Sequence, residues 1–427
     1  MRVSFLLAWR TLVRGHVLGL LLLATFLAHV FLPVLVRSNG TEEGWREMLV
    51  RVVPGSVFLV TALALVCCAC GFFARDRDQS RLALTAVRPA SGFSVALGRW
   101  LALCSVGALV LLLNAGLTVG RLSSAPACQH HIRPAMPSVA VVARAMLDDY
   151  LKDPQTPEAV RKAPRATVLE LLANKELDRY DVIAAGKSLR WPFPSDALEN
   201  AQKPCLRVRF ATAFEMKAPL KGAFGIGAFA AVVTNQTQSV LDVPLQASTS
   251  PVTAVESVEG VSSLPLSFVN TGTETVMLRP RRDLELLLPA DAFGWNLLRA
   301  SLQMFASLAL LSGFGLFLSA ALSRPVAVFT ALVAISVALM VPSVVEQFPD
   351  ELGTTFANRL GLGLSRLIRG ATALVTEADP IADLATDTCI EWLALAKCLA
   401  LNAVAFPLAF LSLAAHLIRR KSLPDRT

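Results

Sequence analysis

The sequence is poor in charge, in tyrosine and in the motifs of enzymes. Charged residues make up only 17% of its 427 residues, and tyrosine occurs twice. A soluble globular domain carries about 25% charged residues, so the chain is too apolar to be entirely soluble. It contains no GxSxG or HExxH motif and no evident catalytic pair of carboxylates. We therefore expect a chain that catalyses nothing by itself and carries no cofactor.

The net charge of +8 does not predict a nucleic-acid-binding protein. Such proteins gather lysine and arginine in a patch interleaved with aromatic residues, and no such run occurs here. The arginines stand instead at the ends of apolar blocks, where basic residues set the orientation of a membrane protein. We expect membrane lipid around the chain and no nucleic-acid partner.

Long apolar blocks are what the sequence has in abundance. Hydrophobic residues make up 54% of the chain, and a helix needs about 20 apolar residues to cross a bilayer. The blocks predict an α-helical polytopic membrane protein with about six transmembrane helices. We expect these helices at 17–36, 54–73, 97–119, 297–322, 326–345 and 398–418, with 390 as an alternative start of the last one.

The apolar blocks divide the chain into three parts. Residues 1–120 form a membrane part with a loop at 74–99, residues 121–295 a soluble domain, and residues 296–427 a second membrane part with an outer loop at 346–389. Lysine and arginine are about twice as frequent in the short loops on the side of the termini, and such loops stay in the cytoplasm. We expect both termini inside, and the soluble domain outside, the cytoplasmic membrane of a bacterium.

The soluble domain changes its periodicity once. Residues 137–185 repeat apolar side chains at helical spacing, whereas apolar and polar residues alternate from Cys205 onward, as in a strand with one buried face. Further strands are expected at 224–233, 240–247, 264–269 and 275–288. The pattern predicts an α+β domain built as a β-sandwich preceded by short helices.

Two of the eight cysteines, Cys128 and Cys205, lie in the soluble domain. Disulfides persist outside the cytoplasm, so a bond between them and two reduced thiols are equally open interpretations. The CxxC spacing at 67–70 lies within an apolar span, where small residues serve helix packing. The adjacent His130 and His131 lack an evident third ligand. The sequence therefore predicts no metal site.

Polar residues within the apolar spans are few. Charged ones mark ion paths, and we expect only Lys397 to come close to the membrane interior. If the last helix starts at Cys398, the Lys397 side chain reaches the membrane surface. Asn114 and Asn402 are expected to form hydrogen bonds between helices.

The loop between the second and third spans is the most distinctive short segment. It opens with Arg75-Asp76-Arg77-Asp78, continues with an apolar run that includes Leu82 and Leu84, turns at Arg88-Pro89-Ala90-Ser91 and enters the third span with Gly98-Arg99. The apolar run predicts a short helix at the membrane surface that Pro89 ends. Such a helix can dock into a groove of a partner, although an ordinary basic loop explains its charges equally well.

This order of residues resembles the permease subunits of ABC-2 type ABC transporters. In that family the loop carries an acidic and basic cluster, an apolar helix, a proline-containing turn and a glycine followed by a basic residue. Phe5-Leu6-Leu7-Ala8-Trp9-Arg10 resembles the family's interfacial helix, and Arg419-Arg420-Lys421 is similar to its basic end. Gln79-Ser80 stands where the family often has Gly-Thr, and the soluble domain is larger than the usual outer loop.

The resemblance implies partners and a function. A separate ABC-type ATPase subunit would dock on the loop, with residues 82–87 as the coupling helix, and a second permease copy, identical or related, would complete an ATP-driven exporter. The site residues that it implies are Arg75, Asp76, Asp78, Leu82, Leu84, Arg88, Pro89 and Arg99. The alternative function is that of a scaffold or sensor, which transports nothing and binds through the soluble domain.

Overall fold

The computed structural model divides the chain into two compact units. One comprises Met1–Pro126 and Ala292–Thr427, and the other Ala127–Asp291. These bounds lie within a few residues of the expected bounds of the soluble domain, 121 and 295. The structure describes the chain except residues 36–41, 79–90, 123–126, 154–155, 157, 162–164, 195–203, 210–219, 227–228, 236–239, 248–255, 259–260, 348–378 and 423–427.

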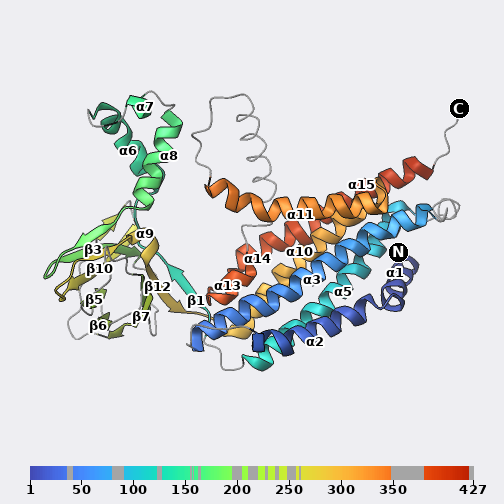
Figure 1. The fold of residues 1–427 in the computed structure, drawn as a ribbon, viewed down its shortest axis with the longest axis horizontal. Helices are drawn as coiled ribbons and strands as arrows, with labels where there is room; N and C mark the ends of the chain where they lie inside the picture. Colours follow the sequence, from blue (N-terminus) through green and yellow to red (C-terminus); the bar gives the residue numbers. More distant parts are fainter. Residues whose placement is uncertain are drawn as a thin grey trace. The chain divides into compact units, whose positions relative to one another are not determined.

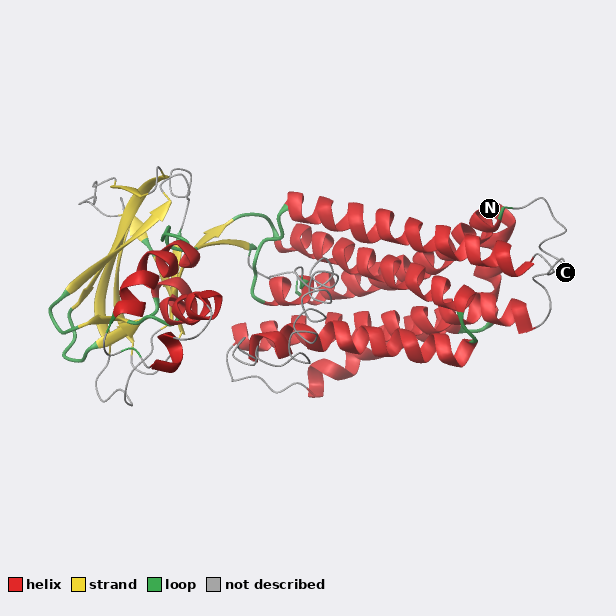
Figure 2. Cartoon of the chain, turned by 90° about the horizontal axis from the view of Figure 1, so that it is seen from above, coloured by secondary structure: helices red, strands yellow, loops and turns green. Residues whose placement is uncertain are grey.

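The first unit is a bundle of long helices (Figures 1 and 2). Its helices are α1 (Arg2–Arg14), α2 (Val17–Leu35), α3 (Glu42–Asp78), α5 (Gly92–Arg121), α10 (Phe293–Ala321), α11 (Arg324–Gln347), α13 (Pro380–Ala385), α14 (Trp392–Cys398) and α15 (Phe406–Ser422). Five helices among the described residues are long and apolar enough to cross a membrane: α2, α3, α5, α10 and the continuous run Trp392–Arg419. The protein is therefore mostly helical, with the composition of a membrane-embedded chain.

The sixth predicted span, 326–345, falls on α11. Helix α11 has 24 residues, and its side chains are described as far as Val337; this described part, Arg324–Val337, is apolar. Five spans are thus supported by length and composition among the described residues, and the sixth stays a prediction.

The last span begins at Trp392, earlier than Cys398, so Lys397 lies within the helix and is exposed. A π-helical turn, Leu399–Ala405, joins α14 to α15. Its wider turn precedes Pro407, whose ring would clash with a carbonyl one turn earlier in a regular α-helix. A Cβ on Gly313 of α10 would lie 3.1 Å from Pro407 Cα, so the two helices approach closely at this point.

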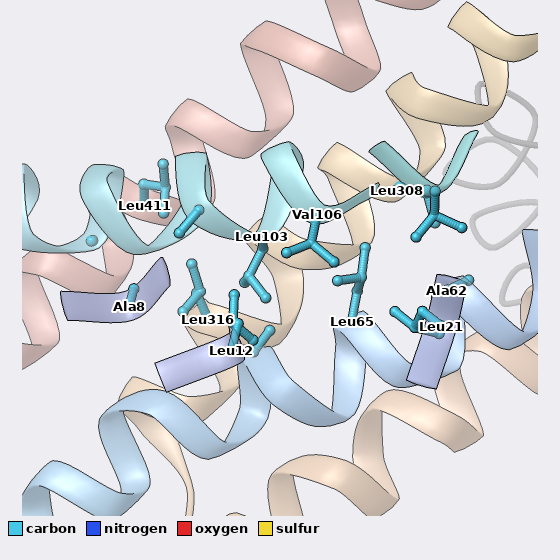
Figure 3. Packing of buried hydrophobic residues seen from close by; sticks show 14 of the residues in the cluster. Ala8, Leu12, Leu21, Ala62, Leu65, Leu103, Val106, Leu308, Leu316 and Leu411 are labelled. Atoms are coloured by element: carbon cyan, nitrogen blue, oxygen red, sulfur yellow. The ribbon is translucent and has the colours of Figure 1, made fainter. Parts of the chain in front are cut away.

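Helix α10 is the centre of the bundle. It contacts α3, α5, α11, α13, α14 and α15, and 67% of its apolar window is buried, against 17% for α2 and 22% for the last span. Figure 3 shows the core that Leu65 of α3, Leu103 and Val106 of α5 and Leu308 and Leu316 of α10 form. The peripheral helices therefore keep broad apolar faces for lipid or for another chain.

The two ends of the bundle differ in composition. The start of α1 and the end of α15 lie at the same end (Figure 1), together with the end of α3 and the starts of α5 and α11. We call this the basic end, because it holds Arg75, Arg99 and Arg324. The chain leaves for the second unit, and returns from it, at the opposite or distal end. Helix α3 has 37 residues, about 55 Å at 1.5 Å per residue, and so extends beyond the hydrocarbon of a bilayer.

The second unit contains two main β-sheets that share one core. One has the strand order β1 (Gln129–Ile132), β12 (Leu284–Pro289), β4 (Cys205–Arg209), β7 (Val240–Pro244). The other has the order β3 (Ser188–Pro194), β10 (Val261–Asn270), β5 (Leu220–Ile226), β6 (Phe229–Asn235), β8 (Gln246–Ala247), with β9 (Glu256–Val258) also paired to β10. Leu206 and Leu286 of the first sheet and Trp191, Phe224 and Phe268 of the second are buried in the same cluster. The two sheets thus pack as a sandwich.

Two of the expected strands are wrong in their extent. Residues 224–233 form parts of β5 and β6, which pair as an antiparallel hairpin. Residues 275–288 contain the short β11 (Val276–Leu278), which pairs with β2 (Asp181–Ile183), then a helical turn α9 (Pro280–Asp283) and finally β12. Continuous apolar patterns concealed both breaks, because each pair of segments keeps one face toward the core.

The short helices α6 (Val139–Lys152), α7 (Glu158–Arg161) and α8 (Arg165–Leu177) lie within the expected helical region. Ala143 and Leu147 of α6 pack on Val168 and Leu172 of α8 in a small separate core. However, β1 precedes these helices and pairs with β12, the last strand of the unit. The first and last strands are therefore neighbours, which brings the two connections to the helical unit together.

Cys128 and Cys205 are both described, and no disulfide joins them. Cys128 precedes β1 and exchanges backbone hydrogen bonds with residues that follow β12, whereas Cys205 is paired with Leu287 on the other side of β12. Two strand spacings amount to about 9.5 Å, while the Cα atoms of a disulfide lie within about 7 Å of each other. In this structure β12 therefore separates the two cysteines by more than a disulfide spans.

A buried carboxylate holds the edge of this sheet. The side chain of Glu285 accepts a hydrogen bond from His131 Nδ1 at 3.2 Å and pairs with Arg133 Nη2, also at 3.2 Å, and Glu285 is only 5% exposed. The hydrogen bond from His131, together with the charges of His131 and Arg133, lowers the pKa of Glu285 from 4.5 to about 2. The ionised form is thus favoured by folding.

We expect the stability of the second unit to fall when the pH drops from about 4.5 towards 2. A carboxylate whose pKa is lower in the folded state stabilises that state above its unfolded pKa, here by about 3 kcal/mol, and this contribution disappears as it protonates. Urea unfolding of the full-length protein, followed by pulsed hydrogen exchange in β1 and β12, would measure it. Glu285→Gln should remove this pH dependence, and an unchanged profile in that variant would contradict the assignment.

Candidate functional site

The basic end contains a cavity of about 660 Å³ between α1, α3, α5 and the start of α11. Its walls combine apolar side chains of α1 with charged side chains from three other helices. Its lining includes Leu7, Leu12, Gly71, Arg75, Asp76, Arg99 and Arg324, together with Cys67 and Cys68. The structure thus brings together Arg75, Asp76 and Arg99, three of the site residues predicted from the sequence.

The ion pair between Asp76 and Arg99 is the centre of this site. Asp76 lies in the last turn of α3 and Arg99 two turns after the start of α5, and their side chains are 19% and 13% exposed. The guanidinium carbon of Arg99 also lies 4.4 Å from the ring centre of Phe73 and 5.7 Å from that of Phe72. Its Nη1 is buried and has no hydrogen-bond partner among the described residues. Arg99 is therefore held firmly by Asp76 and the two rings.

Helix α1 packs across the start of α5. With 13 residues it is too short to cross a bilayer. Ala8 and Leu12, one turn apart, are buried beneath it, whereas Leu6 and Leu7 remain exposed. A Cβ on Gly98 would lie 2.8 Å from Ser4 Cβ and 2.9 Å from Phe5 N, so only glycine allows this approach. Gly98 thus lets α1 pack closely on α5, and the next residue, Arg99, binds Asp76.

A leucine at position 98 is expected to displace α1 from α5. The added Cβ would overlap the backbone of α1, which cannot shift as a flexible side chain can. Hydrogen exchange of residues 2–14 in the purified protein should rise at least tenfold if α1 detaches. Gly19→Leu is the matched control, because a Cβ on Gly19 meets nothing within 4 Å. Equal exchange in the two variants would contradict the packing role.

A second contact ties α3 to the central helix just before the loop. Ser319 Oγ of α10 accepts hydrogen bonds from the backbone N–H groups of Phe73 and Ala74, at 3.0 and 3.1 Å. It donates to the carbonyl oxygen of Cys70 at 2.8 Å. The hydroxyl is fully buried and forms hydrogen bonds with backbone N–H and carbonyl groups of α3. A side chain that inserts into the backbone hydrogen bonds of a helix can bend that helix locally. The end of α3 is thereby fixed to α10.

The remaining predicted site residues lie at or beyond the end of α3. Asp78 is the last residue of that helix, and its side chain is not described. Leu82, Leu84, Arg88 and Pro89 lie outside the described residues. The chain is described again from Ser91, which caps α5 by accepting a hydrogen bond from the N–H of Ser94 at 3.2 Å. The predicted turn therefore ends in an N-cap, as its serine favours.

The structure corrects one expectation about charge in the spans. Arg299, and not only Lys397, lies in an apolar helix, in the second turn of α10 at the distal end, and it is 4% exposed. It donates to the carbonyl oxygen of Ile390 at 3.1 Å and stacks 4.3 Å from the ring centre of Trp392. Nearby, Asn296 bonds both Ile390 N and Thr388 O. A single arginine near the end of a long apolar run did not stand out in the sequence.

The amides expected to join helices are both buried. Asn402 Nδ2 donates to Cys398 Sγ in the same helix, at 3.5 Å. Near Asn114 the bond between helices is formed by His29 Nε2 of α2 and Thr118 Oγ1 of α5, at 3.3 Å. No group of three or more potential metal ligands occurs in the part of the chain that the structure describes.

Three contacts define the geometry of the basic end. An ion pair joins α3 to α5, a serine joins α3 to α10, and a short surface helix covers the cavity that they enclose. Comparisons of the chain with models of known protein families, with curated proteins and with solved structures find no match.

Proposed function

We propose that the chain is the permease subunit of an ATP-driven ABC exporter, with both termini in the cytoplasm and the unit 127–291 outside. The observation that carries the proposal is the packing of α1 across Gly98, directly beside the Asp76–Arg99 pair and at the point where loop 79–90 leaves α3 and returns to α5. A partner bound to that loop would press on α1, α3 and α5 together.

The contacts around the loop suggest how such a force would reach the rest of the bundle. Motion of the loop would act on Asp76 and Arg99, and therefore on α3 and α5. Ser319 would pass the motion of α3 to α10, which contacts most of the other helices. ATP hydrolysis would take place in the separate ATPase subunit, and the permease would contribute no catalytic residue.

The peripheral helices offer a surface to a second permease copy. Leu23 and Phe31 of α2 and Leu413 of α15 are more than half exposed. A shallow apolar groove of about 380 Å³ also lies between α2 and α3. Lipid would cover these faces in a single chain, and a second copy would cover part of them in the assembled transporter.

The proposal is tested by affinity purification of the tagged chain from its native membrane in mild detergent. We expect an ABC-type ATPase subunit to co-purify at a stoichiometric ratio, and Arg88→Ala to reduce that ratio about tenfold while leaving the permease folded. Arg51→Ala, at the distal end of α3, is the matched control. Recovery of the permease without any ATPase would contradict the proposal.

That negative outcome would favour the alternative function, a scaffold or sensor. The unit 127–291 has its own core, which is what an independent binding module needs. In that case substitutions in residues 74–99 should leave binding by the second unit unchanged, and a partner should be recovered through residues 127–291 instead.

A further inference from the structure

The cavity at the basic end is lined by more positively charged than negatively charged side chains. Three guanidinium groups, those of Arg75, Arg99 and Arg324, line it together with one carboxylate, Asp76. That carboxylate is bound to Arg99, which leaves a formal excess of two positive charges. Arg75 and Arg324 are exposed residues of α3 and α11, so their charged groups are available to a ligand.

One of the three arginines is already positioned for an anion. Arg99 is fixed by Asp76 and by the rings of Phe72 and Phe73, while its buried Nη1 lacks a partner among the described residues. A buried donor without an acceptor is unfavourable. The exposed Arg75 and Arg324 supply the donors that an anion can reach, and phosphate is the anion whose geometry suits several guanidinium groups.

The opposite wall of the cavity is apolar. Leu7 and Leu12 of α1 and Val17 of α2 line it, and α2 exposes further apolar side chains beyond Val17, among them Leu20 and Leu23, which are 62% and 53% exposed. An exposed apolar face on a membrane helix lies against acyl chains. A ligand that fits both walls has a phosphate group at one side and hydrocarbon at the other.

We propose that this cavity binds the phosphate headgroup of an anionic phospholipid, with its acyl chains along α1 and α2. A volume of about 660 Å³ is in the range of sites that enclose small ligands. Basic pockets between helices at a membrane surface attract anionic lipid headgroups. The site needs no ATPase, so it is independent of the proposed transport function.

The position of Arg324 supplies a way to close the cavity without removing charge. Arg324 Nε would lie 3.7 Å from a Cβ on Gly71, at ordinary contact distance, with no backbone atom closer. Gly71→Leu therefore has room for its Cβ and directs a larger side chain into the cavity. This variant keeps all three arginines and fills part of the space that the headgroup would occupy.

The test is native mass spectrometry of the full-length protein in detergent, titrated with phosphatidylglycerol or with phosphatidylcholine. We expect phosphatidylglycerol to bind about tenfold more tightly, and Arg75→Gln and Arg324→Gln to weaken it about fivefold each. Gly71→Leu should abolish this preference, whereas Arg51→Gln, which removes an arginine at the far end of α3, should leave it unchanged. Labelling of Cys67 and Cys68, which line the cavity, should slow in the presence of phosphatidylglycerol.

Inorganic phosphate distinguishes a lipid from a free anion. If millimolar phosphate displaces the lipid and protects the two cysteines equally, the cavity is a site for a free phosphate group and the proposal of a lipid is wrong. Equal affinity for the two lipids would also overturn it. So would an unchanged preference in Gly71→Leu, provided that the variant elutes as a single folded species.

Discussion

A leucine in place of Gly315 is expected to destabilise the helical unit by about 3 kcal/mol or more. A Cβ at this position of α10 would lie 2.8 Å from the Cβ of Ala69 and 3.4 Å from the carbonyl oxygen of Val66, both on α3. Overpacking a tight contact costs about 1–3 kcal/mol and more where backbone must move. Because α3 and α10 are the most heavily buried spans, their separation would open the core of the bundle.

Thiol labelling during thermal unfolding in detergent would measure this effect. Cys70 and Cys104 are buried in α3 and α5, so their reaction with a thiol reagent reports opening of the core. Gly116→Leu is the matched control, because it adds the same side chain to a membrane helix where a Cβ meets nothing within 4 Å. Equal unfolding temperatures for the two variants would show that the contact of Gly315 with Ala69 is not limiting.

Replacement of Asp76 by alanine is the second change with a large expected effect, about 2–3 kcal/mol. The Arg99 guanidinium would lose its carboxylate while staying mostly buried, and an uncompensated buried charge is more costly than the loss of a salt bridge at a surface. The same thiol assay should therefore show an earlier transition.

A double variant separates stability from coupling. In Asp76→Ala/Arg99→Met no unpaired charge remains, so most of the stability should return. If the pair also couples the loop to the bundle, the double variant should remain defective in transport although it is stable. Purely additive effects of the two single changes would indicate that the side chains do not interact.

The helical architecture was predictable because hydrophobic length is a local property. Each run of about 20 apolar residues reports its own span, without any knowledge of its neighbours. The soluble unit was less predictable, since one apolar pattern at 224–233 covers a hairpin, and strand β1 finds its partner some 150 residues later in β12. Pairing over such a distance leaves no trace in periodicity.

The candidate site, too, was predictable from the sequence only in part. The sequence placed Asp76 and Arg99 on either side of one loop, but their contact depends on how α3 and α5 pack. Ser319 and Arg324 enter the site from the other half of the chain, and neither has a local signal. The sequence shows Gly98 beside a basic residue, whereas the close packing of α1 against Gly98 follows only from the distances to Ser4 and Phe5.

Helix α3 also has the proportions of a lever with unequal arms. It packs tightly on α10 at Ala69, opposite Gly315, and its distal part carries Arg46, which is bound to Asp387 at 2.5 Å. At 1.5 Å per residue the arm from Ala69 to Asp76 is about 10 Å long, and the arm from Ala69 to Arg46 is about 35 Å. If α3 tilts as a rigid rod about that fulcrum, a displacement of about 1 Å at Asp76 becomes about 3 Å at Arg46, in the opposite direction.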